Sequence, residues 1–347
     1  MTVTVKNDKS EPAKTESLLS RKLDLGSQMT TKPPQIDMVL DGLPLGSVGV
    51  ILGSGGVGKS MAVVHIAHAV ATGRDDLGGC LLGPGSHKTG RVVYLAGEDS
   101  EDIIHHRVHA FAEHIPADRR DEVVSTLARN VDIVPLVGTA PSLLDASGDL
   151  NDDAVASVRG AARGARLLVI DPLRQFHAGD ENNNGAVTTV IKAIAQIAHE
   201  ERCTIIIVHH VSKAGAKDDP DASMSRGASA ITDNARWVLA ITKISETRCQ
   251  NEGLPEDAWR YVAVRKVKAN YVEIGAETIL SRIRGGGGVL EPLAVSPLKP
   301  NAVATALAMT APTKLPGTAR WSVDDDEHED GFPMTRGYED RDIFGGS

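Results

Sequence analysis

The sequence predicts an α/β protein with a mostly parallel central sheet flanked by helices, and three stretches support that prediction. A glycine-rich loop from Gly53 to Ser60 reads G-x-x-x-x-G-K-S and stands between a β-branched run and a helical pattern. Two further runs, 166–171 and 203–208, are rich in Leu, Ile and Val, as expected of strands buried on both faces of a parallel sheet. Helical periodicity between these runs completes the strand–helix alternation that is typical of such folds.

The residue types of the glycine-rich loop predict a phosphate-binding site of the Walker A kind. Glycines allow backbone angles that place successive N–H groups around a di- or triphosphate, and the following helix adds the positive end of its dipole. Lys59 is expected to reach the β- and γ-phosphates, and the Ser60 hydroxyl to ligate Mg²⁺. ATP and Mg²⁺ are therefore the expected cofactors. The loop residues assigned to nucleotide binding are Gly53, Ser54, Gly55, Gly56, Val57, Gly58, Lys59 and Ser60.

The amino-acid composition limits the classes of protein to which this chain can belong. A chain of 347 residues with 41% hydrophobic content can bury a full core, and no apolar run approaches the ~18–20 residues that span a bilayer. The N-terminus lacks the apolar segment of a secretion signal. The three cysteines are far apart and odd in number, which is typical of a reducing compartment without a disulfide framework. We therefore expect a cytoplasmic protein without membrane attachment.

Charge and polarity divide the chain into three parts. Residues 1–32 are polar and predicted to be a disordered arm, residues 33–298 form the folded domain, and residues 299–347 form an acidic, largely disordered tail. The net charge is −9, and residues 311–347 hold nine acids against four bases, which is −5. The remaining −4 neither requires nor excludes a nucleic-acid partner. The tail either solubilises the chain or competes with DNA and recruits a replication partner.

Two strand ends supply candidate catalytic carboxylates, because ligands bind at the carboxyl ends of parallel strands. Glu98 follows the strand at 91–96 and is assigned to activating the attacking water, whereas Asp99 and Ser100 are assigned to capping the next helix. Asp171 closes the run 166–171 in the Walker B pattern and is expected to support Mg²⁺. The alternative for Asp171 is a cap of the following turn.

Histidine and arginine residues complete the candidate site. His210 follows the strand at 203–208 and can either hydrogen-bond the γ-phosphate or bond a neighbouring backbone group. Arg107, on a helix expected over 102–114, is a candidate contact to the nucleotide or to a neighbouring subunit. Arg236 starts a strand at 236–241 and could stabilise transition-state charge across an interface, although a surface role is the commoner one for such an arginine. Lys268 and Arg226 are alternative candidates for this contact across an interface. A hairpin is expected beyond, with strands at 259–264 and 265–271.

Eight sequence blocks, in one order between about Gln35 and Pro292, resemble the RepA-type replicative helicases of broad-host-range plasmids. Four of the blocks are Ile-His-His-Arg-Val-His, Val-His-His-Val-Ser-Lys, Ser-Arg-Gly-Ala-Ser and Asp-Asn-Ala-Arg-Trp. The others are the Walker A loop, Tyr-Leu-Ala-Gly-Glu-Asp, Leu-Val-Ile-Asp-Pro-Leu-Arg-Gln-Phe-His and Lys-Ala-Asn-Tyr. A P-loop alone would indicate only an NTPase, whereas the ordered set is specific.

This resemblance implies a RecA-like ATPase core that assembles as a hexameric ring, moves on single-stranded DNA and unwinds duplex during plasmid or mobile-element replication. It implies that His210 senses the γ-phosphate and that Arg236 is an arginine finger given in trans. A plasmid initiator or a primase is a further expected partner. The alternative function is a RecA-like regulatory or recombination ATPase that binds DNA without unwinding it.

Loops that face the channel of such a ring track the DNA backbone with basic side chains. Lys213, Lys217 and Arg226 are the candidates in this chain. Asp218, Asp219 and Asp221 in the same segment depart from a simple basic loop.

Overall fold

The structure is a computed structural model, and it describes residues 18–85, 87–177, 184–211, 229–255 and 257–293. The predicted DNA-contacting residues Lys213, Lys217 and Arg226 and the acidic tail lie outside the described residues. The chain divides into two units, residues 1–295 and 296–347, and only the first contains described residues. Within the described part, no helix combines the length and hydropathy needed to cross a membrane.

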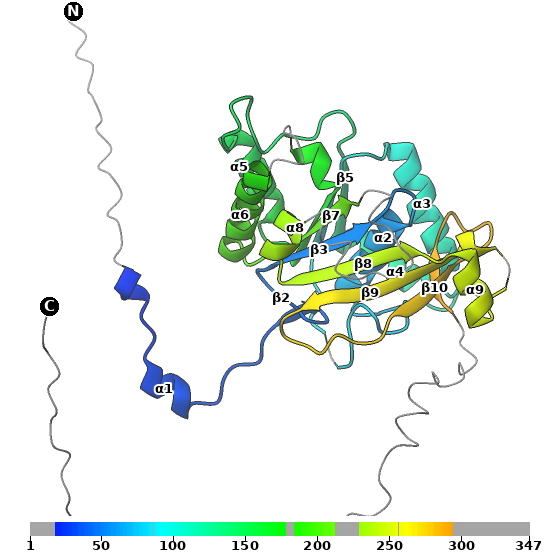
Figure 1. Ribbon diagram of the computed structural model, residues 1–347, viewed down its shortest axis with the longest axis horizontal. Helices are drawn as coiled ribbons and strands as arrows, with labels where there is room; N and C mark the ends of the chain where they lie inside the picture. The colour runs from blue at the N-terminus through cyan, green and yellow to red at the C-terminus, as the bar shows by residue number, and fades with distance from the viewer. Residues whose placement is uncertain (1–17, 86, 178–183, 212–228, 256, 294–347) are drawn as a thin grey trace, which may run out of the picture. The chain divides into compact units, whose positions relative to one another are not determined.

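A nine-stranded sheet forms the centre of the first unit (Figure 1). Its strand order is β11-β10-β9-β8-β3-β7-β6-β4-β5, and the six strands from β8 to β5 run parallel to one another. The last three strands of the described residues continue the sheet beyond β8, and each is antiparallel to the strand before it. The bounds are β3 (Val48–Gly53), β4 (Val92–Ala96), β5 (Val131–Pro135), β6 (Leu167–Asp171), β7 (Thr204–His210), β8 (Trp237–Lys243), β9 (Tyr261–Ala269), β10 (Thr278–Arg282) and β11 (Leu290–Pro292).

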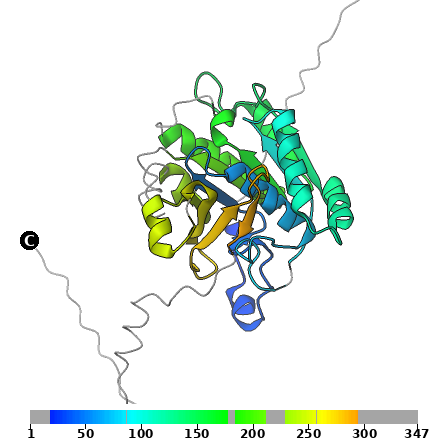
Figure 2. The ribbon, with the colours of Figure 1, turned by 90° about the vertical axis from the view of Figure 1, so that its right-hand side faces the viewer.

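Helices cover both faces of the sheet (Figure 2). One layer contains α2 (Lys59–Thr72), α3 (Glu101–His114) and α4 (Arg120–Asn130). The other contains α5 (Asp152–Ala162), α6 (Asn184–Glu200) and α8 (Ser229–Asn234). The remaining elements are η1 (Leu18–Arg21), α1 (Leu25–Thr30), the small pair β1 (Met38–Leu40) and β2 (Leu43–Pro44), η2 (Leu173–Phe176), α9 (Glu246–Glu252) and η4 (Ala258–Arg260).

The alternation of side chains along each central strand explains why these runs are apolar throughout. In β6, Val169 packs in the cluster beneath α2 and α3, whereas Leu168 and Ile170 pack in the cluster beneath α5 and α6. All five residues of β6 are buried. A strand covered on both faces needs hydrophobic side chains at every position, so β-propensity and burial favour the same residues.

The predicted fold class, a mostly parallel sheet flanked by helices with a C-terminal β extension, is confirmed. The internal division of that extension differs from the prediction. β9 runs unbroken from Tyr261 to Ala269, and its hairpin partner is β10, paired through Ser281 and Tyr261. No turn interrupts the chain at 264–265, because Arg265 and Lys266 remain paired with Ala240 and Leu239 of β8. The helix α4 is an addition that the sequence pattern does not predict.

Candidate active site at the carboxyl edge of the sheet

The glycine-rich loop joins the end of β3 to the start of α2. Gly56 and Gly58 adopt positive φ angles of 70° and 101°, which side chains other than glycine rarely tolerate. A Cβ added at Gly55 or Gly56 would meet no atom within 4 Å, so the outer surface of the loop is open. The loop therefore offers backbone N–H groups at a helix N-terminus to an approaching phosphate.

Lys59 lies folded against this loop. Its Nζ donates hydrogen bonds to the carbonyl oxygens of Gly53 and Ser54, each at 2.9 Å, and lies 3.0 Å from Nδ1 of His210. The residue is only 4% exposed, and burial lowers the pKa of Lys59 to about 8, against the opposing attraction of Asp171 and Glu98. A buried ammonium that is bonded to backbone carbonyls is held where it can meet phosphate oxygens.

Asp171 ends β6 beside the start of α2. The hydroxyl of Tyr94 donates to Asp171 Oδ2 at 2.7 Å, and the Ser60 side chain lies near the same carboxyl group. Burial raises the pKa of Asp171, while the side chains of Tyr94 and Ser60 oppose that rise. The proximity of Ser60 to Asp171 brings the two predicted magnesium-supporting oxygens together. Both are oxygen donors of the kind that Mg²⁺ prefers.

His210, at the end of β7, connects Lys59 to Glu98. Its Nε2 lies 3.4 Å from Glu98 Oε2, while its Nδ1 faces the ammonium of Lys59. Since the ammonium can only donate, Nδ1 accepts and Nε2 bears the proton that points toward Glu98. The Glu98 side chain is 43% exposed, which leaves its carboxylate accessible to water. Lys59, His210 and Glu98 therefore form a connected series of polar side chains beyond the ends of β3, β7 and β4.

Asp99 and Arg107 form an ion pair beside this series, with 2.7 Å between Arg107 Nη1 and Asp99 Oδ2. Ser100 occupies the N-cap position of α3, although its side chain makes no capping bond. The predicted capping role therefore applies to Ser100 by position and not to Asp99. On the same helix, the rings of His105 and His109 stack at 6.4 Å. The described ranges contain no group of three His, Cys, Asp or Glu side chains suited to a metal.

Arg236 lies away from the glycine-rich loop. It precedes β8, whose first residue, Trp237, pairs with Gly49 near the start of β3, whereas the glycine-rich loop follows the end of β3. Arg236 is exposed, and it stands at the opposite edge of the sheet from its own Lys59. The alternative donor Lys268 bonds the backbone carbonyls of Thr232 and Asp233 at 2.9 and 3.2 Å.

Two residues at the site escape prediction from the sequence. Tyr94 reads as part of an apolar strand, and the only signal is that a buried phenol needs a partner for its hydroxyl. Arg282, the last residue of β10, donates from Nη2 to the Val57 carbonyl at 2.8 Å and from Nη1 to the Trp259 carbonyl. Burial lowers the pKa of Arg282. No local pattern marks it, because its partner Val57 is 225 residues away in the chain.

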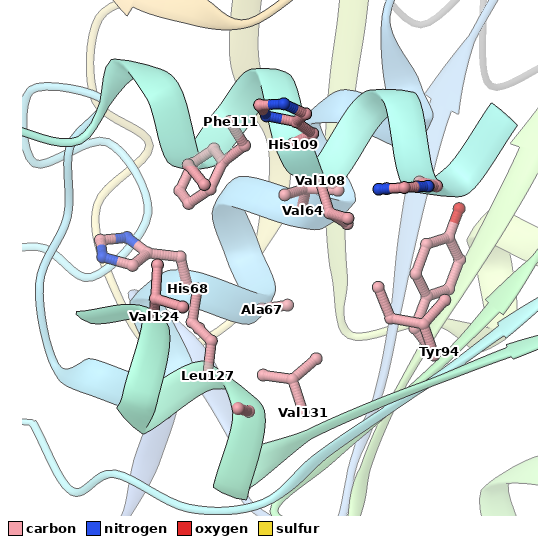
Figure 3. A pocket seen from close by; sticks show the side chains of 14 residues that line it. Val64, Ala67, His68, Tyr94, Val108, His109, Phe111, Val124, Leu127 and Val131 are labelled. Atoms are coloured by element: carbon pink, nitrogen blue, oxygen red, sulfur yellow. The ribbon is translucent and has the colours of Figure 1, made fainter. Parts of the chain in front are cut away.

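An apolar hollow of about 470 Å³ lies behind the site, between α2, α3, α4 and the strands β4 and β5 (Figure 3). Val64, Phe111, Leu127 and Ile133 line it, and Tyr94 stands at one end. The lining residues include neither a lysine nor a carboxylate, which a magnesium-bound triphosphate would require. The lining of this hollow therefore does not fit a magnesium-bound triphosphate.

Comparisons with known proteins agree with the fold. A family model described as an AAA domain matches residues 12–216, more than half of the chain. A solved ATPase domain is similar in structure, with a TM-score of 0.51 and 13% identity over 78% of this chain and 96% of that one. A DnaB-like replicative helicase, described with its interactions with primase, gives a TM-score of 0.49 and 16% identity over 72% of this chain and 57% of that one. At such identities the likeness to the solved ATPase domain establishes a shared fold.

Proposed function

The chain belongs to the AAA domain family, and from this premise we propose that it is an ATP-dependent DNA helicase. In this proposal it is a ring-forming motor that hydrolyses ATP to ADP and phosphate while it moves on single-stranded DNA in plasmid or mobile-element replication. The observation that supports the proposal best is the convergence of Lys59, Asp171 and the Glu98–His210 pair at one edge of the sheet.

Each of these residues has a distinct role in the proposed hydrolysis. Lys59 and the loop N–H groups bind the phosphates, and Ser60 and Asp171 hold the Mg²⁺ that neutralises charge on them. Glu98 accepts a proton from the water that attacks the γ-phosphorus, after which phosphate separates from ADP. The exposure of Glu98 and its hydrogen-bond range from His210 support this assignment.

His210 is proposed to couple nucleotide state to Glu98. A single imidazole stands between Lys59 and Glu98, so any turn of Lys59 toward a γ-phosphate changes the partner of His210 Nδ1. That change alters the hydrogen bond that holds the Glu98 carboxylate. Arg107, paired with Asp99 next to Glu98, is proposed to contact the nucleotide or a neighbouring subunit.

Assembly and partners form the second part of the proposal. A hexameric ring would bring the Arg236 of one subunit to the nucleotide of the next, and Lys213, Lys217 and Arg226 would line a channel for single-stranded DNA. A plasmid initiator or a primase is the proposed loading partner, and the cytoplasm the proposed location. The fold shared with the solved ATPase domain supports a motor-type core.

Strand displacement on a forked DNA substrate tests the proposal directly. We expect ATP-dependent displacement by the wild-type protein and none by Lys59→Ala, because the alanine removes the buried cation that faces the phosphates. DNA-stimulated ATP hydrolysis without any displacement would favour the alternative, a regulatory or recombination ATPase that binds DNA without unwinding it.

A further inference from the structure

The carboxyl edge of the sheet has two sides, and the catalytic groups occupy only one of them. In the strand order, β3 lies between β7 and β8. His210, Asp171 and Glu98 stand at or just beyond the ends of β7, β6 and β4, all on the β7 side. A triphosphate that presents its γ-phosphate to this side must direct its ribose and base toward β8, β9 and β10.

Trp259 and Arg282 stand at this second side of the edge. β9 is antiparallel to β8, so its start lies where β8 ends, as the pairing of Lys243 with Val262 shows. Trp259 precedes β9 by two residues, and Arg282 ends β10 next to the Ser281–Tyr261 pair. Both residues therefore lie at the edge of the sheet that holds the glycine-rich loop.

Arg282 joins Trp259 to the glycine-rich loop. One guanidinium nitrogen donates to the Trp259 carbonyl, and the other donates to the Val57 carbonyl at 2.8 Å and reaches the Gly56 carbonyl at 3.5 Å. The same nitrogen would lie only 3.7 Å from a Cβ placed on Gly58. The turn that contains Trp259 is fixed again by an ion pair between Arg284 and Asp257.

The Trp259 side chain is available for a ligand. This residue is 61% exposed, although the guanidinium that bonds its backbone carbonyl is half-buried. An indole face stacks on nucleobases without regard to their hydrogen-bonding edges. From these observations we propose that Trp259 is the base-stacking residue of the nucleotide site, and that Arg282 is the positioning residue that holds it against the glycine-rich loop.

This inference rests on the proposed nucleotide site and predicts which nucleotides that site prefers. Stacking discriminates by the area of the base, so purine nucleotides should bind more tightly than pyrimidine nucleotides, with little difference between ATP and GTP. The phosphate contacts made by Lys59 and the loop are separate from this contact. Inorganic tripolyphosphate has no base, so its binding affinity should not depend on Trp259.

Calorimetric titration of the full chain with Mg²⁺ and either ATP or tripolyphosphate tests the proposal. Trp259→Ala should weaken ATP binding about tenfold or more, because base stacking on an aromatic side chain contributes on that order. Tripolyphosphate binding should stay within about twofold of the wild type on the same principle. Trp259→Phe retains an aromatic face and should recover most of the ATP affinity.

Tyr271→Ala is the matched control, because Tyr271 is an exposed aromatic residue beyond the other end of β9. It should leave the binding of both ligands unchanged. An equal loss of ATP and tripolyphosphate binding in Trp259→Ala, or an unchanged ATP affinity, would overturn the stacking proposal. Wild-type protein that binds tripolyphosphate as tightly as ATP would also overturn it. Absence of all phosphate binding in the wild type would instead reject the proposed ATPase site.

Discussion

At the scale of single residues, the ammonium of Lys59 is the group whose charge state decides phosphate binding in the proposed site. Burial lowers the pKa of Lys59 to about 8, and phosphate oxygens would favour its charged form. ATP binding near pH 8 should therefore take up about half a proton, and affinity should fall as pH rises above about 8. Calorimetry at pH 8 in two buffers of different ionisation enthalpy measures this uptake.

The control for this prediction is Lys59→Arg, whose guanidinium does not lose its proton in this range. If Lys59→Arg still binds ATP, that binding should take up no proton at pH 8. The neighbours Asp171, Glu98 and His210 are present in both proteins, so they do not account for a difference. An ATP affinity that stays constant from pH 7 to pH 9 would contradict the assignment of Lys59 as the titrating group.

At the scale of elements, the sequence predicts those strands whose burial demands an unbroken apolar run. β3, β6 and β7 are predictable because both of their faces are covered and glycine or charged residues mark their ends. The predicted division of β9 is wrong because Arg265 and Lys266 break its hydrophobic pattern, although the strand continues and stays paired with β8 across a register shift next to Lys266. α4 escapes prediction because Val123 is its only fully buried residue, which gives little helical periodicity.

The candidate site can be predicted only where a motif fixes residue type and spacing together. Lys59, Ser60 and Asp171 belong to such motifs, and the structure brings them together. Arg282 bonds backbone carbonyls, which place no demand on the identity of the partner residues. A contact of that kind leaves no mark in the sequence and becomes visible only in three dimensions.

The hydrogen bond between strands β4 and β6 carries a prediction at the same scale. Tyr94→Phe should lower the free energy of unfolding by about 1–2 kcal/mol, because it removes a buried hydrogen bond to Asp171. The Tyr94 bond also lowers the pKa of Asp171, so its loss should raise that pKa further. Since Asp171 must be ionised to support Mg²⁺, the acid limb of ATP hydrolysis should move to higher pH.

Urea unfolding and a pH profile of hydrolysis measure the two effects. Tyr271→Phe removes a phenol hydroxyl at a site that is 44% exposed and should change neither quantity. If Tyr94→Phe unfolds at the wild-type urea concentration and keeps the wild-type pH profile, the Tyr94–Asp171 bond has no role in the site.

At the scale of the whole molecule, Arg236 and Lys59 of one chain stand at opposite edges of the same sheet. Arg236 therefore cannot act at its own nucleotide site without a rearrangement of the β3–β8 pair. If it stabilises the transition state, it must do so on a neighbouring subunit, where an arginine finger contributes ~10³–10⁵ in rate. Lys268 is the weaker candidate, since its ammonium already bonds two backbone carbonyls at the end of α8.

Subunit mixing distinguishes a finger in trans from a surface arginine. Arg236→Ala and Lys59→Ala should each abolish ATP hydrolysis alone, because one lacks the finger and the other the phosphate-binding cation. In mixed assemblies, some interfaces combine the intact Lys59 of one variant with the intact Arg236 of the other. An equal mixture should recover about a quarter of the wild-type rate, because about half of the subunits retain Lys59 and half of their neighbours retain Arg236. Full hydrolysis by Arg236→Ala alone would show that Arg236 is not an arginine finger. An inactive mixture would mean that Lys59 and Arg236 do not meet across an interface.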